Sequence, residues 1–260
     1  MSNVLTKYKE DVTDVFGLGV EVLNVARSLK NISMDIKLLA YNGIVQAARI
    51  GSDQGKSLIT LSGFLSDLPS QIAPELEDME DLTRTLSTRI TVASILVRRF
   101  MLYTIGLDNT LKLLTKENQR LGLSPHLNLL DIKDLQEIIS NKYPDAVSRE
   151  HQINIRRLAK RNMDLMNELN EKLSAAQAII VHSRKKIERI RRSGFIANYM
   201  GSNISIESSY LSGNHSSFIG LVSNIKNMVD MLNERLDIML DKINKGEKVL
   251  SNLIKTRIVK

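Results

Sequence analysis

The stretch at residues 38–68 decides the fold, and it begins LLAYNGIVQAARIGSDQGKSL before continuing as a largely apolar segment. Up to Ile50, small and apolar residues recur every three or four positions, which is the period of a helix with one buried face. Residues 51–55 read GSDQG, and two glycines that bracket polar residues predict a turn. Helical periodicity resumes after Lys56. The stretch therefore predicts a helical hairpin with a narrow tip, because small residues let two backbones approach closely.

The segment before the turn, residues 3–50, carries one long apolar seam. The seam keeps an alternating spacing of three and four residues, which is typical of a coiled coil. It passes from large to small residues as it nears the turn, which indicates helices that come closer together there. The seam residues are Leu5, Tyr8, Val12, Val15, Gly19, Val22, Ala26, Leu29, Ser33, Ile36, Ala40, Gly43 and Ala47.

The returning segment, residues 58–117, also has an apolar face, but it contains Pro69 and Pro74. Proline removes a backbone donor and clashes with the preceding turn of a helix, so we expect a kink or a break there. Carboxylates are favoured in the first turns of a helix because of its dipole. We therefore expect a helix to restart after Pro74, where the acidic residues are Glu75, Glu77, Asp78, Glu80 and Asp81.

The second half of the chain repeats the first at an offset of 161 residues, which aligns Asn203 with Asn42. A seam begins at about residue 148, and it too passes from large to small residues. Residues 212–215 read SGNH and predict a turn, after which the last segment carries a regular apolar stripe. At this offset the seam residues Ser33, Ala40 and Ala47 align with Gly194, Gly201 and Ser208.

These patterns predict an all-α protein, a long antiparallel four-helix bundle or coiled coil built from two tandem helical hairpins. Residues 1–120 form the first hairpin, with its tip near 51–57. Residues 121–147 form a linker with a short helix, and residues 148–260 form the second hairpin, with its tip near 212–217. We expect the two hairpins to fold against each other; the alternative is that each pairs with another chain. The expected turn residues are Gly51, Gly55 and Gly213.

The composition suits long helices, because aromatic residues make up only 4% of the 260 residues and tryptophan is absent. Without cysteine there is no disulfide and no thiolate site. No apolar run approaches the roughly 20 residues that a membrane helix needs, so we expect a cytoplasmic protein with no membrane segment. The net charge of +7 is compatible with an anionic partner, but we favour good solubility as its meaning.

Motifs for chemistry are absent from the sequence. Residues 51–57 read GSDQGKS and approach a phosphate-binding loop, but the glycines are too close together and a helix precedes them. No pair among the four histidines has the spacing of metal ligands on a helix. We therefore expect no enzymatic activity, no metal and no cofactor. The histidines are His126, His151, His182 and His215.

A basic cluster occupies residues 184–192, with Glu188 as its one acidic member. We expect it to form a solvated outer face of the bundle. The alternative is a docking site for an acidic partner or for nucleic acid, and the absence of interleaved aromatic residues disfavours nucleic acid. The basic residues are Arg184, Lys185, Lys186, Arg189, Arg191 and Arg192.

The predicted tip resembles the signalling tip of methyl-accepting chemotaxis proteins, the bacterial chemoreceptors. Gln46 stands where that family has Glu, Ile50 replaces an Ala, and residues 57–58 read SL in place of Gly-Phe. The second hairpin keeps other parts of the family pattern, which are Phe195, Asn198, Asn203, Glu207 and Phe218. The first hairpin matches at Leu38, Leu39, Ala40, Asn42, Ala47, Ala48, Arg49, Gly51 and Gly55.

This resemblance implies a soluble signal-transduction or scaffold protein whose tip docks a chemotaxis-type histidine kinase and coupling adaptor, or other chemoreceptors, and which forms homo-oligomers. The alternative is a coiled-coil structural or polymerising protein, similar to a cytoskeletal one, that has lost kinase coupling. No convincing Glu or Gln pair marks a methylation site. The two asparagines have an alternative role in setting helix register. The partner-binding residues that the resemblance implies are Asn42, Gln46, Arg49, Phe195, Asn203 and Glu207.

Overall fold

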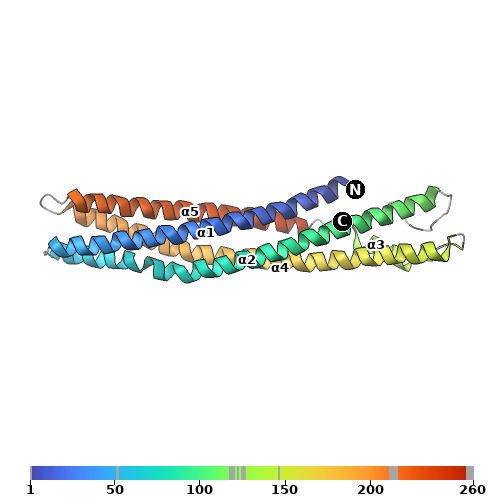
Figure 1. Ribbon diagram of the computed structural model, residues 1–260, viewed down its shortest axis with the longest axis horizontal. Helices are drawn as coiled ribbons and strands as arrows, with labels where there is room; N and C mark the ends of the chain where they lie inside the picture. Colours follow the sequence, from blue (N-terminus) through green and yellow to red (C-terminus); the bar gives the residue numbers. More distant parts are fainter. Residues whose placement is uncertain are drawn as a thin grey trace. The chain divides into compact units, whose positions relative to one another are not determined.

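The computed structural model describes residues 2–50, 53–116, 121, 123, 127–145, 147–210 and 216–255. These residues form five α-helices and no strand, so the predicted all-α fold is confirmed (Figure 1). Four of the helices are long, and the short one lies in the connection between the second and the fourth. Their bounds are Ser2–Ile50 for α1, Asp53–Lys116 for α2, Ile132–Ser140 for α3, Arg149–Ser209 for α4 and Ser216–Lys255 for α5.

The packed residues divide into two compact units. Unit 1 comprises residues 1–16, 87–178 and 247–260, and unit 2 comprises residues 17–86 and 179–246. Each of the four long helices contributes residues to both units. The units do not coincide with the two predicted hairpins, because each unit contains parts of both. Unit 2 holds the ends of α1 and α4 that precede the two hairpin connections.

The predicted seams are buried in the structure. Every seam residue of α1 from Val12 onward is buried, as are most of those on α4. The glycines of the α1 and α4 seams lie in unit 2, where small residues mark close approaches between helices. A Cβ added at Gly194 of α4 would lie 3.1 Å from a Leu232 methyl of α5. A Cβ added at Gly246 of α5 would lie 3.1 Å from Ile180 of α4.

The first turn of α2 corrects the predicted extent of the first connection. Because α2 begins at Asp53, Gly55 lies inside the helix and not in the turn. Gly55 is buried, and a Cβ there would lie 2.7 Å from the Ala47 carbonyl oxygen of α1. Glycine is therefore needed at this position for the close approach of two backbones. Gly51 and Gly213, the other predicted turn residues, lie outside the described residues.

Of the kink or break expected in the returning segment, the break does not occur, because α2 continues through both Pro69 and Pro74. An internal proline costs a helix about 3 kcal/mol. The apolar face is uninterrupted across this region, with Leu68, Ile72 and Leu76 all buried. We infer that tertiary packing on this face outweighs the local cost. The acidic residues after Pro74 consequently lie within a continuing helix and not at a new helix start.

Unit 1 includes a small core where the end of α2, the helix α3 and the start of α4 meet. Large side chains from all three helices, among them Leu114, Ile138 and Ile155, belong to one buried cluster. The predicted short helix is confirmed as α3, and the Asp131 carboxylate caps it by accepting from the Lys133 backbone N–H. The long helix predicted from about residue 148 is confirmed, since α4 begins at Arg149.

The connection after α3 is tied down by polar contacts. The Tyr143 hydroxyl donates to the Ile138 carbonyl oxygen at 2.9 Å, and burial raises the pKa of Tyr143 to about 12. The Arg156 guanidinium donates to the Asn141 carbonyl oxygen at 2.8 Å and lies over the Tyr143 ring, 5.3 Å from its centre. This segment of the connection is therefore a packed part of unit 1.

One buried polar pair crosses the core of unit 1. Thr104 of α2 and Asn162 of α4 are both fully buried, and the Asn162 amide donates to the Thr104 hydroxyl oxygen at 2.9 Å. The Thr104 hydroxyl oxygen also lies 3.3 Å from Oδ1 of the Asn162 side chain. A satisfied polar pair among apolar layers favours one register of two helices over the shifted ones.

Candidate docking surfaces

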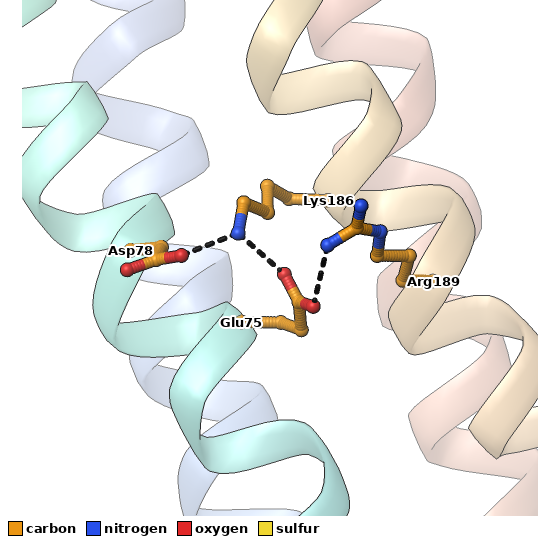
Figure 2. A network of polar contacts seen from close by, with 4 residues as sticks. All are labelled: Glu75, Asp78, Lys186 and Arg189. Atoms are coloured by element: carbon orange, nitrogen blue, oxygen red, sulfur yellow. Dashed lines mark hydrogen bonds and ion pairs between the residues drawn. The ribbon is translucent and has the colours of Figure 1, made fainter.

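Four charged side chains from α2 and α4 form one network in unit 2 (Figure 2). Lys186 lies between two carboxylates: its Nζ is 2.9 Å from Glu75 Oε2, and it also pairs with Asp78. Arg189 Nη1 donates to Glu75 Oε1 at 3.1 Å. Each helix supplies two of these residues at a spacing of three, which places them on the same helical face. The network therefore joins α2 to α4.

The network holds its members in their charged forms. Burial raises the pKa of Glu75, but hydrogen bonds from Lys186 and Arg189 outweigh burial and the pKa ends below its ordinary value of 4.5. A hydrogen bond from Lys186 lowers the pKa of Asp78 below 3.8. Hydrogen bonds to Asp78 and Glu75 raise the pKa of Lys186 above 10.5. All three groups are thus charged at neutral pH.

The basic cluster is therefore not a free cationic stripe. Besides the two residues in the network, Arg184 donates to Asn244 of α5, and Arg191 Nη2 lies 3.5 Å from Asp237 of the same helix. The expected solvent-exposed face is present, since four of the six basic residues are exposed. In addition, the cluster joins α4 to α2 on one side and to α5 on the other.

The six residues that the chemoreceptor resemblance implied for partner binding all lie in unit 2, three on α1 and three on α4. Their spacing places the α1 residues within two turns of the helix end. Exposure differs among the six: Asn42, Arg49 and Phe195 are exposed, whereas Gln46, Asn203 and Glu207 are half-buried.

The α1 and α4 residues belong to separate faces of unit 2. A Cβ at Gly43 of α1 would meet both Ser62 of α2 and Leu221 of α5. On the other side, α4 contacts α2 through Lys186 and contacts α5 through Gly194. Since α2 and α5 each touch both of the other helices, α1 and α4 occupy opposite corners of this four-helix arrangement.

Near the end of α1, two buried polar atoms of unit 2 have no hydrogen-bond partner among the described residues. These are Oε1 of Gln46 and Oγ of Ser62. The Ser62 hydroxyl faces Gly43, where a Cβ would lie only 2.8 Å away. A buried polar atom without a partner costs about 1–3 kcal/mol. Substitution of Ser62 therefore tests the packing near the end of α1.

Large apolar side chains are exposed along α1 in unit 2. Four of them follow a spacing of four, three and four residues on a face away from the buried seam, and each is 48–60% exposed. We call this set the α1 stripe. From Leu38 to Arg49, the arginine is the only exposed charged residue of the helix. The α1 stripe consists of Met34, Leu38, Tyr41 and Val45.

A second exposed stripe runs along α4. Its residues are 54–73% exposed, and three of the four are aromatic. Every exposed residue from Phe195 to Tyr210 is uncharged. A surface hollow of about 520 Å³ lies at the start of this stripe, where Arg191, Arg192 and Ile196 join Phe195 in its lining. We call this set the α4 stripe, and it consists of Phe195, Tyr199, Ile206 and Tyr210.

Three of the four members of each stripe are equivalent in the internal repeat, all except Tyr41 and Tyr210. The same offset of 161 residues that aligns the buried seams relates Met34 to Phe195, Leu38 to Tyr199 and Val45 to Ile206. Sequence reasoning flagged only Leu38 and Phe195, through the chemoreceptor resemblance. The signal that could have found the rest is a second series with three-and-four spacing beside the seam, at the same offset in both halves.

The chemical character of the stripes is that of a protein interface. The centres of protein–protein interfaces are depleted of charged residues and enriched in tyrosine, phenylalanine and methionine. Contiguous exposed apolar surface on a folded protein commonly marks an interaction site. Both stripes fit this description, and the residues implied for partner binding lie on them or beside them.

Among the described residues, no group of three or more His, Asp or Glu side chains could hold a metal ion.

One described helical segment, Gly55–Thr115, is long and apolar enough to cross a membrane by length and composition, although 39% of its most apolar window is buried inside the structure. Core helices of water-soluble proteins meet the same criterion, so this finding does not test the expectation of a chain with no membrane segment.

No protein-family model matches the chain, and no curated protein matches it in sequence. Its function is therefore inferred from the two stripes and from the polar residues beside them.

Proposed function

We propose that this chain is a soluble, cytoplasmic signal-transduction or scaffold protein of chemoreceptor-like design, which binds partners and catalyses no reaction itself. Its partners are a chemotaxis-type histidine kinase with its coupling adaptor, or other chemoreceptors. The observation that carries the proposal is the pair of equivalent, charge-poor stripes in unit 2, which adjoin the residues at which the chain resembles the chemoreceptor tip.

Apolar, charged and amide side chains have different roles in the proposed binding. The aromatic and aliphatic residues of the stripes supply apolar area, which is the main source of affinity in such contacts. Arg49 and Glu207 supply charges at the edges of the stripes, where charge affects orientation and partner choice more than affinity. The exposed amide of Asn42 offers both a donor and an acceptor beside the α1 stripe.

The proposal is tested by capturing the kinase and the adaptor with purified variants. Arg49→Glu reverses the charge beside the α1 stripe, and Glu207→Ala removes the charge beside the α4 stripe. Both variants are expected to lose capture while helicity by circular dichroism stays unchanged. Arg99→Glu is the matched control, because Arg99 is an exposed arginine of unit 1. Capture by both variants at the level of the control would refute kinase docking.

A second candidate function is that of a coiled-coil structural protein that polymerises. The duplication of the stripe favours it, because a molecule with two equivalent adhesive faces can bind a further copy at each of them and assemble without end. Electron microscopy of the purified protein separates the two candidates. Arrays that need both kinase and adaptor support docking, and filaments of the protein alone support the structural function.

A further inference from the structure

Unit 1 contains a groove between α2 and α4 that the docking surfaces of unit 2 do not use. Its volume is about 400 Å³, within the range of pockets that hold small organic ligands. Each helix contributes four of the lining residues, at spacings that place them on one face. From α2 these are Asn109, Thr110, Leu113 and Leu114, and from α4 they are His151, Asn154, Arg157 and Leu158.

The groove has an apolar side that belongs to the core of unit 1. Leu114 is 1% exposed and is a member of the buried cluster, and Leu158 packs against that cluster. Leu113, by contrast, is 57% exposed and lies on the solvent side of the groove. An apolar group in the groove would therefore cover the exposed Leu113 and contact leucines that the core already holds in place.

The polar lining is dominated by hydrogen-bond donors. Arg157 supplies a permanent positive charge, and its Nη2 donates to the side-chain Oδ1 of Asn154 at 3.1 Å. The side-chain NH₂ of Asn154 takes no part in that bond and can donate to a ligand. Asn109, on the facing helix, brings a second side-chain amide. Among the described residues that line the groove there is no carboxylate.

The ring of His151 is held in place by Ser148. The Ser148 hydroxyl oxygen accepts the His151 backbone N–H at 3.2 Å and lies 2.9 Å from Nδ1 of the ring. This contact occupies Nδ1 and leaves Nε2 as the ring nitrogen that a ligand can meet.

We propose that this groove binds a small organic anion, specifically a monocarboxylate with a short apolar tail. The carboxylate lies against Arg157 with help from the side-chain amides of Asn109 and Asn154, and the tail lies along Leu113 and Leu158. A ligand held in this way contacts both α2 and α4 and so adds a bridge between them within unit 1. The inference concerns unit 1 alone and does not depend on partner docking by unit 2.

The experiment is isothermal titration of the full chain with 3-phenylpropionate, and with its neutral analogue 3-phenylpropanol. Saturable binding of the carboxylate is expected, with the alcohol at least about tenfold weaker because it cannot pair with the guanidinium. Acetate tests the need for the tail and is expected to bind more weakly than 3-phenylpropionate. Absence of saturable binding up to about 10 mM, or equal binding of acid and alcohol, would overturn the proposal.

Matched variants assign the binding to the groove. Arg157→Gln is expected to weaken 3-phenylpropionate by about tenfold, since a charge-assisted pair is lost. Arg161→Gln is the control, because Arg161 is an exposed arginine one turn further along α4 and does not line the groove. Leu113→Ser is expected to weaken the acid but to leave acetate unchanged. Equal affinities of Arg157→Gln and the unchanged chain would also overturn the proposal.

Discussion

Units 1 and 2 share the same four long helices, yet they place their large side chains differently. In both units large apolar residues such as Phe100 of unit 1 fill the core. Near the ends of α1 and α4 in unit 2, Ala40, its repeat partner Gly201 and Gly43 occupy buried positions, while aromatic residues are exposed. Large apolar side chains such as Leu102 are exposed in unit 1 too, but among the described residues they are fewer there than in unit 2.

This difference separates stability from binding. Buried apolar area stabilises a fold by about 25 cal/mol per Å², so small interior residues contribute less than large ones. The same large residues on the outside leave an apolar surface that a partner can cover. Among the described residues, unit 2 therefore exposes more large apolar side chains than unit 1 does, and many of them lie near the ends of α1 and α4.

The largest effect that tests this comparison is expected at the buried polar pair of unit 1. Asn162→Ala removes the partner of the Thr104 hydroxyl and leaves a cavity, so we expect a loss of about 1–3 kcal/mol in the free energy of unfolding. Urea titration followed by circular dichroism measures it. Asn167→Ala on the exposed face of α4 is the control, with a change within about 0.5 kcal/mol.

A double variant sharpens this test. Thr104→Val combined with Asn162→Leu replaces both polar groups with apolar ones, so it should recover much of the lost stability. If Asn162→Ala lowers the free energy of unfolding by no more than Asn167→Ala does, the Thr104–Asn162 pair does not stabilise unit 1.

The second prediction concerns the charge network of unit 2. The pKa values of Glu75 and Asp78 are lowered in the folded chain, so the unfolded chain binds more protons at acid pH and stability rises with pH there. The stabilisation is present above the ordinary values of 4.5 and 3.8, and it is lost as pH falls through the lowered values. Lys186→Met should therefore lower the melting temperature at pH 7 by about 2–4 °C.

The pH dependence distinguishes this electrostatic effect from lost packing. The difference in melting temperature between Lys186→Met and the unchanged chain should shrink as pH falls below about 4, because both carboxyls are then increasingly neutral. Lys185→Met is the control, since Lys185 is the exposed neighbour on the same helix. A difference that stays constant with pH would mean that Lys186 acts through its aliphatic stem.

The sequence predicted those features that depend on local pattern. Three-and-four spacing identified the buried seam of α1, and the short helix within residues 121–147 was also expected. The network of Glu75 and Lys186 was not predictable, because the two residues lie 111 positions apart and nothing local in the sequence links them. The break expected at Pro69 fails for a related reason: the local cost of a proline can be read from the sequence, whereas the packing that offsets it cannot.

The stripes show a different limit of sequence reasoning. Met34, Leu38, Tyr41 and Val45 have the same spacing as the seam. Periodicity alone identifies two apolar faces on α1 but does not decide which one is buried. The structure buries the smaller residues, Ala40 and Gly43 among them, because only small side chains allow the helices of unit 2 to approach closely.

The third prediction has the opposite sign from the first. Ser62→Ala removes a buried hydroxyl without a partner, so it is expected to stabilise the chain by about 0.5–1 kcal/mol. Ser66→Ala is the matched control on the same helix, because the Ser66 hydroxyl donates to the Gly63 carbonyl oxygen at 2.7 Å. If Ser62→Ala destabilises the chain more than Ser66→Ala does, the Ser62 hydroxyl makes a hydrogen bond in the folded protein and the premise of this prediction is wrong.

The smallest expected effect on stability is at the stripes, where the effect on binding should be the greatest. Leu38→Ser and Tyr199→Ser change repeat-equivalent residues that are each 60% exposed, so each should alter the free energy of unfolding by no more than about 0.5 kcal/mol. The double variant with both substitutions should abolish partner capture, since the α1 stripe and the α4 stripe both lose apolar area. Leu102→Ser is the control, because Leu102 is 65% exposed in unit 1 and belongs to neither stripe. A double variant that unfolds more easily but still captures its partner would show that the stripes serve the fold, and partner binding would then have to be sought on another surface.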